Sequence, residues 1–488
     1  MVNLKKLSAV FIVIVLVASS VFSVAASSPY EGFTYNFWVA VVPAPVSYMA
    51  TRTVSALDIC DELGPFINPM DVSVSSNGHI YLLDTGNNRI VVFDQELNLI
   101  RVIDSFLRDR SQDTFNNPNG IFICVNLNIY IADTDNRRVV ILDTYGNFIN
   151  MIYDPDLGDI DDVVDFRPMR VAADSAGRMY VIVLHVFEGI MRFDTNGDFF
   201  GYFGTINVRV SAADLFWRMV STAEQRARQR RFIPTEFTGL DVDDYGFVFA
   251  THSGAAAEAD QVMRLNPRGN NVLRNFNENT SIRGIESFGP FMPRSVFEDI
   301  VARPNGMFSV LDSTQNRVFT YDAEGNLLYV FGGTGTVMGM SRRPVAIDII
   351  GDNIIVLDAL RGRLIYFEPT EYGALINEAI ALRYQGDEAG SVAIWRQALL
   401  LNENSELAFA GVGRAHLLDG EYTLAMDYLR RGMDLRYYSM ALGRAREVFI
   451  ETYLPFALTA VAVLAVALVI YSVYKKIKYS GFDEDGVI

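Results

Sequence analysis

Between residues 69 and 369 the hydrophobic positions form short runs that are separated by turn residues. An apolar run is followed by a Gly or Asn turn, a second apolar run that ends in Asp, a polar turn and a third apolar run. In the first copy these parts are Met70–Val74, Asn77-Gly78, Ile80–Asp84, Gly86–Arg89 and Ile90–Phe93. Short apolar runs between Gly, Asn and Asp turns are typical of antiparallel strands. Each copy therefore predicts one small β-sheet.

The pattern occurs six times. The middle or Gly position of the first turn falls at residues 78, 127, 177, 246, 306 and 351, so successive copies lie 45 to 69 residues apart. A repeat of this length made of short strands is typical of propeller blades. One blade cannot bury both faces of its sheet, so the copies must stack around an axis. The sequence predicts a mainly β fold, with a six-bladed propeller over residues 69–369.

The first five copies continue into a fourth strand, as in Phe148–Ile152, which follows the turn Tyr145-Gly146-Asn147. The sixth copy stops after three strands, before Pro369 and a helical pattern. The N-terminal segment 28–68 contains a strand-like run, Phe33–Val42, that has no partner of its own. We expect this run to supply the outer strand of blade six. That pairing would close the ring and remove two exposed sheet edges.

The polar turn after the second strand holds an Asp and an Arg five residues apart in four copies. This run resembles the NHL repeat family of six-bladed propellers, and the resemblance implies a bacterial envelope setting. Copies three and four depart from it, because Val183 and His252 replace the Asp. We expect each Asp to cap turn amides and each Arg to pack across the turn, as structural residues. The four pairs are Asp84 and Arg89, Asp133 and Arg138, Asp312 and Arg317, and Asp358 and Arg363.

Residues 370–452 change to helical spacing. The turns Tyr384-Gln385-Gly386 and Leu418-Asp419-Gly420 lie 34 residues apart, as do Trp395 and Leu429. This region resembles tetratricopeptide repeats, which have that period. The resemblance implies a concave surface that docks a protein segment. A rigid stalk that holds the propeller away from a bilayer is an equally good interpretation.

Both ends of the chain carry apolar segments. Residues 1–27 have Lys5 and Lys6, an apolar run and then small residues, which predicts a secretory signal or an uncleaved anchor. Leu454–Tyr474 has 21 residues and no charge, which matches one membrane crossing. Lys475, Lys476 and Lys478 follow at once, so the tail 475–488 is expected in the cytoplasm. We therefore expect a single-pass cell-membrane protein with most of the chain extracytoplasmic.

Composition narrows the function. The chain has 488 residues and a net charge of −17, with no long basic stripe, which argues against a nucleic-acid partner. It has two cysteines, Cys60 and Cys124. A disulfide between them is conceivable in an exported protein, but Cys124 lies in an apolar strand, so we favour free buried thiols.

The connections between blades are long, and the third, residues 204–235, is the most unusual. Within it, Ser211–Arg231 reads as an amphipathic helix with arginines crowded at its end. The arginines could recognise carboxylates, phosphates or an anionic glycan. Alternatively, they complement the helix dipole and pair with nearby acids. The candidate ligand-face residues are Trp217, Arg226, Arg228, Arg230, Arg231 and His252.

An enzymatic function would depend on His185 and His252, which fall near the second-strand ends of blades three and four. Propellers of the lyase and lactonase kinds resemble one another in placing His and acid metal ligands around the channel. Two isolated histidines without a third ligand at a readable spacing are a weak metal signature. The acids at 241, 243 and 244 are expected to be turn acids. We predict no catalytic residue and no cofactor.

The sequence thus favours an extracytoplasmic, membrane-anchored binding or scaffold protein. Its propeller would recognise a protein, a peptide or an envelope saccharide, and its helices would position the propeller or dock a second protein. The alternative is an extracytoplasmic propeller hydrolase or lyase of lactones or modified peptides, with a metal site near His185 and His252.

Overall fold

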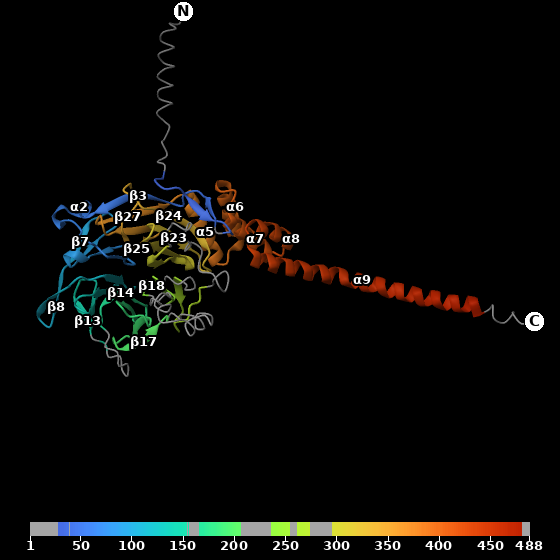
Figure 1. The fold of residues 1–488 in the computed structure, drawn as a ribbon, viewed down its shortest axis with the longest axis horizontal. Helices are drawn as coiled ribbons and strands as arrows, with labels where there is room; N and C mark the ends of the chain where they lie inside the picture. The colour runs from blue at the N-terminus through green and yellow to red at the C-terminus, as the bar shows by residue number, and fades with distance from the viewer. Residues whose placement is uncertain are drawn as a thin grey trace, which may run out of the picture. The chain divides into compact units, whose positions relative to one another are not determined.

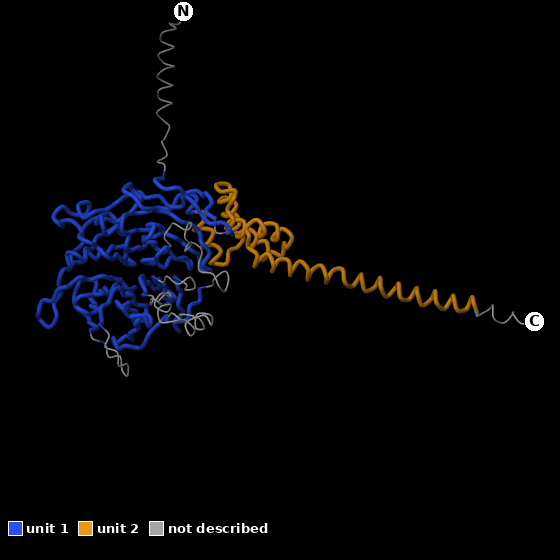
Figure 2. The backbone as a smooth tube through the Cα atoms, viewed as in Figure 1, with its two compact units in different colours: residues 1–374 blue, residues 375–488 orange. Residues whose placement is uncertain are grey.

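The computed structural model describes residues 28–38, 40–153, 155, 165–205, 236–253, 261–273 and 295–480. The chain divides into two compact units, residues 1–374 and residues 375–488 (Figure 2). The strands lie in the first unit (Figure 1). The second unit is helical.

Six antiparallel sheets form the blades of a β-propeller, as the repeat predicts. The first strand of each blade packs against the first strand of the next blade, and the first strand of blade six returns to that of blade one. We call these six the inner strands: β4 (Asp71–Val74), β10 (Gly120–Ile123), β14 (Pro168–Ala173), β18 (Phe237–Val242), β21 (Phe297–Ala302) and β25 (Pro344–Ile350). The ring they make surrounds the central channel.

The other strands follow in chain order within each blade. They are β5 (Ile80–Asp84), β6 (Arg89–Phe93) and β7 (Leu99–Ile103) in blade one; β11 (Ile129–Asp133), β12 (Arg138–Leu142) and β13 (Phe148–Tyr153) in blade two; β15 (Met179–Val183), β16 (Ile190–Phe193) and β17 (Phe199–Phe203) in blade three; β19 (Val248–His252) and β20 (Val262–Leu265) in blade four; β22 (Phe308–Asp312), β23 (Arg317–Tyr321) and β24 (Leu327–Gly332) in blade five; and β26 (Asn353–Asp358) and β27 (Arg363–Pro369) in blade six.

The hydrophobic core lies between neighbouring blades. One cluster joins Tyr81 and Leu83 of blade one to Ile121 and Ile131 of blade two, and similar clusters follow around the ring. The second strand of a blade is therefore covered on both faces, and every residue of β5 is buried. Burying one such side chain stabilises a fold by about 1.5–3 kcal/mol. This explains why the second runs are almost continuously apolar.

An N-terminal strand closes the ring, but it is not the predicted one. Strand β3 (Tyr48–Ser55) pairs with β27 of blade six, from Ser55 opposite Arg363 to Tyr48 opposite Pro369. The predicted segment, Phe33–Val42, instead holds two short strands, β1 (Phe33–Tyr35) and β2 (Val41–Pro43). Strand β1 extends blade five by pairing with β24.

A local turn explains why Phe33–Val42 does not form one continuous strand. The side-chain Oδ1 of Asn36 accepts the backbone amides of Trp38 at 3.0 Å and of Ala40 at 2.9 Å. The chain therefore reverses inside the predicted strand, because Asn readily forms such side-chain to backbone turns.

A buried arginine ties the closing strand to blade five. Arg303 donates to the hydroxyl of Tyr48 at 2.8 Å and to the hydroxyl of Tyr329 at 2.7 Å. The Tyr48 hydroxyl donates in turn to the carbonyl of Asp352 in blade six, at 3.0 Å. The Tyr48 ring also stacks on Phe331, with ring centres 4.9 Å apart.

Short elements connect these parts. They are α2 (Ala56–Ile59), the 3-10 turns η1 (Asp61–Leu63), η2 (Thr85–Asn87) and η3 (Pro304–Gly306), and a hairpin of β8 (Ser105–Arg108) and β9 (Ser111–Thr114) between blades one and two.

The C-terminal helices are α5 (Glu371–Tyr384), α6 (Glu388–Leu401), α7 (Glu406–Leu418), α8 (Tyr422–Arg431) and α9 (Leu435–Ser480). Helices α6 and α8 begin at residues 388 and 422, so their starts keep the 34-residue spacing of the sequence. The likeness to tetratricopeptide repeats stays a prediction. A buried ion pair of 2.6 Å between Arg414 in α7 and Asp434 fixes the turn before α9.

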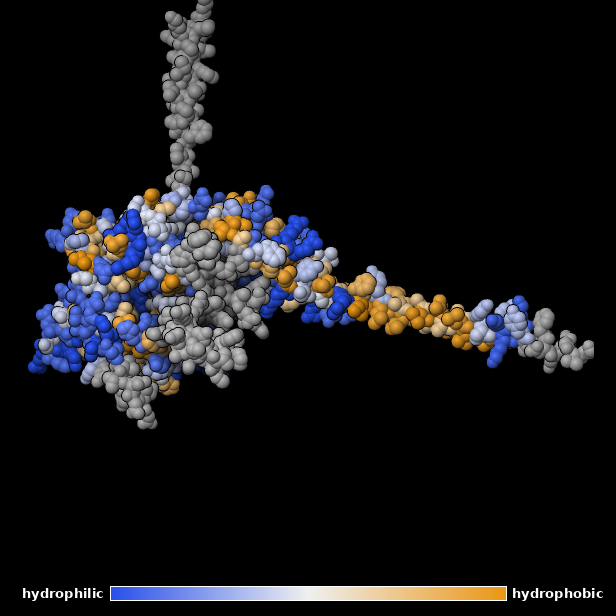
Figure 3. Space-filling view, in the orientation of Figure 1, coloured by the Kyte–Doolittle hydropathy of each residue, from blue (hydrophilic) through white to orange (hydrophobic). Residues whose placement is uncertain are grey.

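Helix α9 has 46 residues, and among the described residues it is the one helix long and apolar enough to cross a membrane. Its apolar window is wholly exposed in the isolated chain. Figure 3 shows hydrophobic residues along the middle of α9 and hydrophilic residues near its C-terminal end. The helix fits a single-pass membrane anchor.

We expect Tyr48→Phe to destabilise the propeller by about 1–3 kcal/mol, because the change leaves one buried Arg303 donor and the Asp352 carbonyl without their partner. The free energy of unfolding in urea measures the effect. Tyr245→Phe removes an exposed hydroxyl and serves as the control, with an expected change within about 0.5 kcal/mol. Equal effects in the two variants would show that the hydrogen bonds of the Tyr48 hydroxyl do not stabilise the closed ring.

Candidate functional site

The inner strands pose a hydrogen-bonding problem. Each is the first strand of its sheet, so one of its edges faces the channel without a partner strand. Buried backbone N–H groups that lack an acceptor are costly. In four of the six inner strands, β4, β10, β21 and β25, side chains of the preceding blade supply acceptors.

Four aspartates provide most of these contacts. Asp71 accepts the amide of Ile121 at 2.8 Å, and Asp299 accepts that of Ile347 at 2.9 Å. Two residues further along the inner strand, contacts of the same kind join Asp241 to the amide of Ala302 at 2.7 Å and Asp348 to the amide of Val74 at 2.6 Å. In every case the carboxylate belongs to one blade and the amide to the next. We call these four residues, Asp71, Asp241, Asp299 and Asp348, the channel carboxylates.

Arg170 fills the corresponding position in blade three. It forms an ion pair of 2.9 Å with Asp71, and its side chain is almost completely buried. It also donates to the carbonyls of Val345 at 2.9 Å, Met70 at 3.3 Å and Asn119 at 3.4 Å. One side chain of blade three therefore reaches across the channel to blades six, one and two.

Glycines occupy the same position in blades two and four, where the backbones approach closely. A Cβ at Gly120 would lie 2.6 Å from the carbonyl oxygen of Met169 in blade three. A Cβ at Gly239 would lie 2.6 Å from the Cα of Asp299 in blade five. Neither distance leaves room for a side chain.

A cavity of about 210 Å³ lies among the C-terminal halves of the inner strands, and all six blades contribute to its wall. Its lining includes the four channel carboxylates and Arg170, and also Asp174, Asp243 and Asp244. Asp244 is exposed at its rim. We call this space the channel cavity. Because acceptors predominate in its wall, it suits a ligand group that donates hydrogen bonds or carries positive charge.

The channel carboxylates are perturbed acids. Burial raises the pKa of Asp241 to about 7 and that of Asp299 to about 8, although Arg170 partly offsets the rise at Asp299. Burial and the negative charge of Asp241 raise the pKa of Asp348 well above its usual range. Burial lowers the pKa of Arg170, but the carboxylates of Asp71 and Asp299 outweigh it, so the net shift is upward. Groups with such shifts cluster at functional sites.

The repeated Asp and Arg residues lie away from the channel cavity. Each Asp accepts the amide of the segment that enters its own blade: Asp84 from Ile67 at 2.7 Å, Asp133 from Asn116 at 2.8 Å, Asp312 from Val296 at 3.2 Å and Asp358 from Arg343 at 3.2 Å. Arg89 pairs with Asp84 at 2.8 Å. In blades five and six the arginines contact other groups: Arg317 lies over the Phe33 ring, and Arg363 donates to the Met340 carbonyl.

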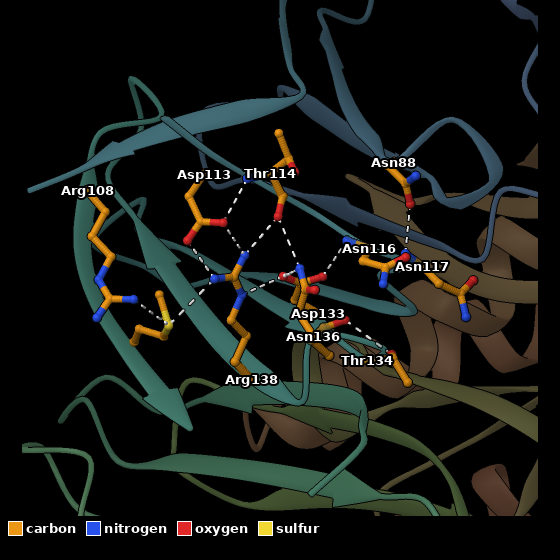
Figure 4. Close-up of polar contacts among 12 residues, drawn as sticks. Asn88, Arg108, Asp113, Thr114, Asn116, Asn117, Asp133, Thr134, Asn136 and Arg138 are labelled. Carbon is orange, nitrogen blue, oxygen red and sulfur yellow. Dashed lines mark hydrogen bonds and ion pairs between the residues drawn. The ribbon is translucent and has the colours of Figure 1, made fainter. Parts of the chain in front are cut away.

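Blade two shows the fullest version of this arrangement (Figure 4). Arg138 pairs with Asp133 at 2.7 Å and with both oxygens of Asp113, at 2.7 and 3.0 Å. It also donates to the carbonyl of Thr114 at 2.8 Å. Because Asp113 and Thr114 belong to β9, Arg138 fastens the β8–β9 hairpin to blade two.

The two candidate histidines differ in their exposure to solvent. His252 is fully buried at the end of β19, with its ring edge-on to Phe237 at 6.1 Å. His185 is exposed and has a φ of 63°, which is the left-handed region. Among the described residues, no group of three or more His, Cys, Asp or Glu side chains could hold a metal ion.

The remaining candidates are Trp217, Arg226, Arg228, Arg230 and Arg231, which lie outside the described residues. Cys60 and Cys124 are both free; Cys124 is buried and Cys60 is partly exposed.

Sequence reasoning missed the channel carboxylates. Asp241 is not a turn acid, because it lies within β18. The available signal was an Asp flanked by apolar residues inside a predicted first strand, as in Met70-Asp71-Val72 and Ile347-Asp348-Ile349.

Comparison with known proteins supports the repeat. The NHL repeat model matches residues 66–93, which contain the first three strands of blade one. No curated protein matches the chain. A virginiamycin B lyase from Staphylococcus aureus is similar in structure, with 12% identity and a TM-score of 0.37 over 69% of this chain and 86% of the lyase. A gluconolactonase from Xanthomonas campestris has 9% identity and a TM-score of 0.38, over 67% of this chain and 97% of that protein.

We expect Arg170→Met to destabilise the propeller by about 3–5 kcal/mol, because the change leaves Asp71 buried without its charge partner. Urea unfolding measures the effect. Arg137→Met in blade two breaks the exposed pair with Asp165 and should cost at most about 1 kcal/mol. A cost for Arg170→Met as small as that of the control would contradict the role given to Arg170.

Proposed function

We propose that this protein is a membrane-anchored binding protein whose propeller recognises its ligand at the channel cavity. The observation that carries the proposal is the cavity of about 210 Å³ to which all six blades contribute. A concave site at the convergence of several elements, with perturbed acids in its wall, is the usual place for a ligand. Arg170 crosses the channel, so a ligand would dock at the cavity rather than thread through the ring.

The cavity wall favours one class among the expected ligands. Its ionisable lining holds seven aspartates and one arginine. A peptide or protein segment that carries Lys, Arg or a free amino terminus would supply both positive charge and hydrogen-bond donors. A neutral envelope saccharide would supply only the donors. We therefore propose a basic peptide segment as the ligand, and saccharide binding becomes an outcome of the test.

The C-terminal helix supports the anchored part of the proposal. The 21 residues Leu454–Tyr474 would extend over about 31 Å as a helix, close to the thickness of a bilayer core. With the lysines after this segment on the cytoplasmic side, the propeller would lie outside the cytoplasm. Helices α5–α8 would then position the propeller or dock a second protein.

The enzymatic alternative places a metal near His185 and His252. Both residues lie in blades that contribute to the cavity wall, yet His252 is enclosed in the core while His185 is exposed. A lyase or hydrolase of this kind would have to draw further ligands from outside the described residues. The binding proposal rests instead on the channel cavity, which the described residues line.

Thermal melting of the full chain in detergent micelles tests the ligand. A Lys- or Arg-containing peptide at about 100 times its dissociation constant should add about 2.7 kcal/mol of stability. Asp244→Asn at the cavity rim should weaken this binding about two- to fivefold, the strength of an exposed charge pair. Asp194→Asn, on an exposed turn of blade three, is the matched control and should leave binding unchanged.

The same panel includes an acidic peptide, cell-wall saccharides and divalent metals. Stabilisation by a saccharide alone would replace the peptide with a sugar as the ligand. Stabilisation by a metal that His252→Ala abolishes would favour the enzyme. A basic peptide that binds equally well to the Asp244→Asn variant would place its site elsewhere on the chain.

A further inference from the structure

The channel carboxylates carry more negative charge than their surroundings neutralise. Of the four acids, Asp71 and Asp299 act on one guanidinium, that of Arg170 from β14. The other charged groups that act on them are also acidic: Glu298 on β21, which acts on Arg170, and Asp243 beside Asp241. The neighbouring inner strand β10, Gly120–Ile123, carries no charged residue. The cluster therefore has an uncompensated negative charge when all four acids ionise.

The acids also act on one another. The charge of Asp71 raises the pKa of both Asp241 and Asp299, and the charges of Asp241 and Asp299 raise the pKa of Asp348. All four acids border the cavity; Asp71 and Asp299 are almost completely buried, whereas Asp241 and Asp348 are partly exposed. Like charges in such a water-poor place repel strongly.

Each channel carboxylate is at the same time a mechanical link, because it holds an inner-strand amide of the next blade. Blade one is linked in this way to blade two, blade four to blade five, blade five to blade six, and blade six to blade one. Repulsion among the acids would push apart the strands that these hydrogen bonds hold together. In Asp71, Asp241 and Asp348 the second oxygen accepts the amide of the next residue in the same strand. A proton on that oxygen removes the repulsion while the first oxygen still accepts the amide of the next blade.

We propose that the channel carboxylates form a proton-responsive latch, which tightens the ring of blades when it takes up protons and loosens the ring when it releases them. The inference concerns the ring itself and does not depend on the identity of the ligand. It assigns the acids a regulatory role in addition to their structural one.

The direction follows from linkage. The folded-state pKa values of Asp241, about 7, and Asp299, about 8, lie above the ordinary Asp value of about 3.9 in an unfolded chain. Between about pH 4 and about pH 8 the folded protein therefore binds more protons than the unfolded chain. This contribution to stability is fully present below about pH 4 and is lost as pH rises through 7 to 8.

The melting temperature of the full chain in detergent, measured from about pH 6 to about pH 9, tests the latch. We expect it to fall as pH rises, and the unfolding equilibrium constant to change by up to about tenfold per pH unit for each proton released. The wild-type profile needs no variant. A melting temperature that stays level or rises over this range would overturn the proposal.

Asp241→Asn and Asp348→Asn assign the effect to the channel. An Asn keeps one acceptor oxygen but cannot ionise, so each variant should be less stable than the wild type at about pH 6, lose less stability as pH rises and therefore show a flatter profile. Asp194→Asn removes an exposed turn carboxylate whose pKa is lowered by backbone hydrogen bonds, and it should keep the wild-type slope. Burial also raises the pKa of Asp133 and Asp312, so part of the slope will persist in every variant. Channel variants that keep the full wild-type slope would refute the latch.

Discussion

The unpaired edges of the six inner strands are the constraint on which the rest of the structure depends. A propeller can bury the faces of its sheets between blades, but the first strand of each blade still turns an open edge to the channel. In four of the six blades, an aspartate of the preceding blade accepts an amide on that edge. The solution concentrates acids in the channel. Arg170 offsets part of that charge and joins four blades through one side chain.

Aspartate side chains also accept backbone amides in the segments that lead into the blades. Asp84, Asp133, Asp312 and Asp358 each hold the amide of the segment that leads into their own blade, so this aspartate is structural in all four copies. The paired arginine is more adaptable. It reaches the neighbouring carboxylate in blades one and two, and in blade two it also captures a hairpin between the blades. A repeated residue thus has a constant backbone contact and a variable side-chain partner.

The fold could be predicted from the sequence because its information is periodic. The second strands are apolar on both faces and follow a recurring turn in each copy, and Asp ends four of them, so six blades can be recognised from the sequence. The closing strand was harder, since Phe33–Val42 has strand-like composition and the Asn36 turn that divides it depends on one side chain. The channel site could not be predicted in the same way. Each channel carboxylate is one polar residue within an apolar run. That these residues form a cluster is evident only in the folded ring, where the runs lie side by side.

The proposed function rests on two features of the chain, the channel cavity and the long apolar helix α9. The channel cavity gathers residues from every blade, so its shape depends on the closure of the ring by β3 and on the hydrogen bonds between blades. Binding and stability are therefore expected to be linked through the same carboxylates. The metal-dependent alternative would instead use His185, which is exposed, and His252, which is buried. Among the described residues, neither belongs to a group of three or more possible metal ligands.

Hydrogen exchange in an Asp299→Ala variant tests the central claim most directly, because the account assigns the lost contact to a particular neighbour. Asp299 belongs to β21 of blade five, but the amide that it holds is that of Ile347 in blade six. The account predicts that exchange accelerates most in β25 around Ile347, while the amides of β22 in blade five keep more of their protection. Acceleration confined to blade five, or no change at Ile347, would contradict the claim that the channel side chains hold each blade to the next.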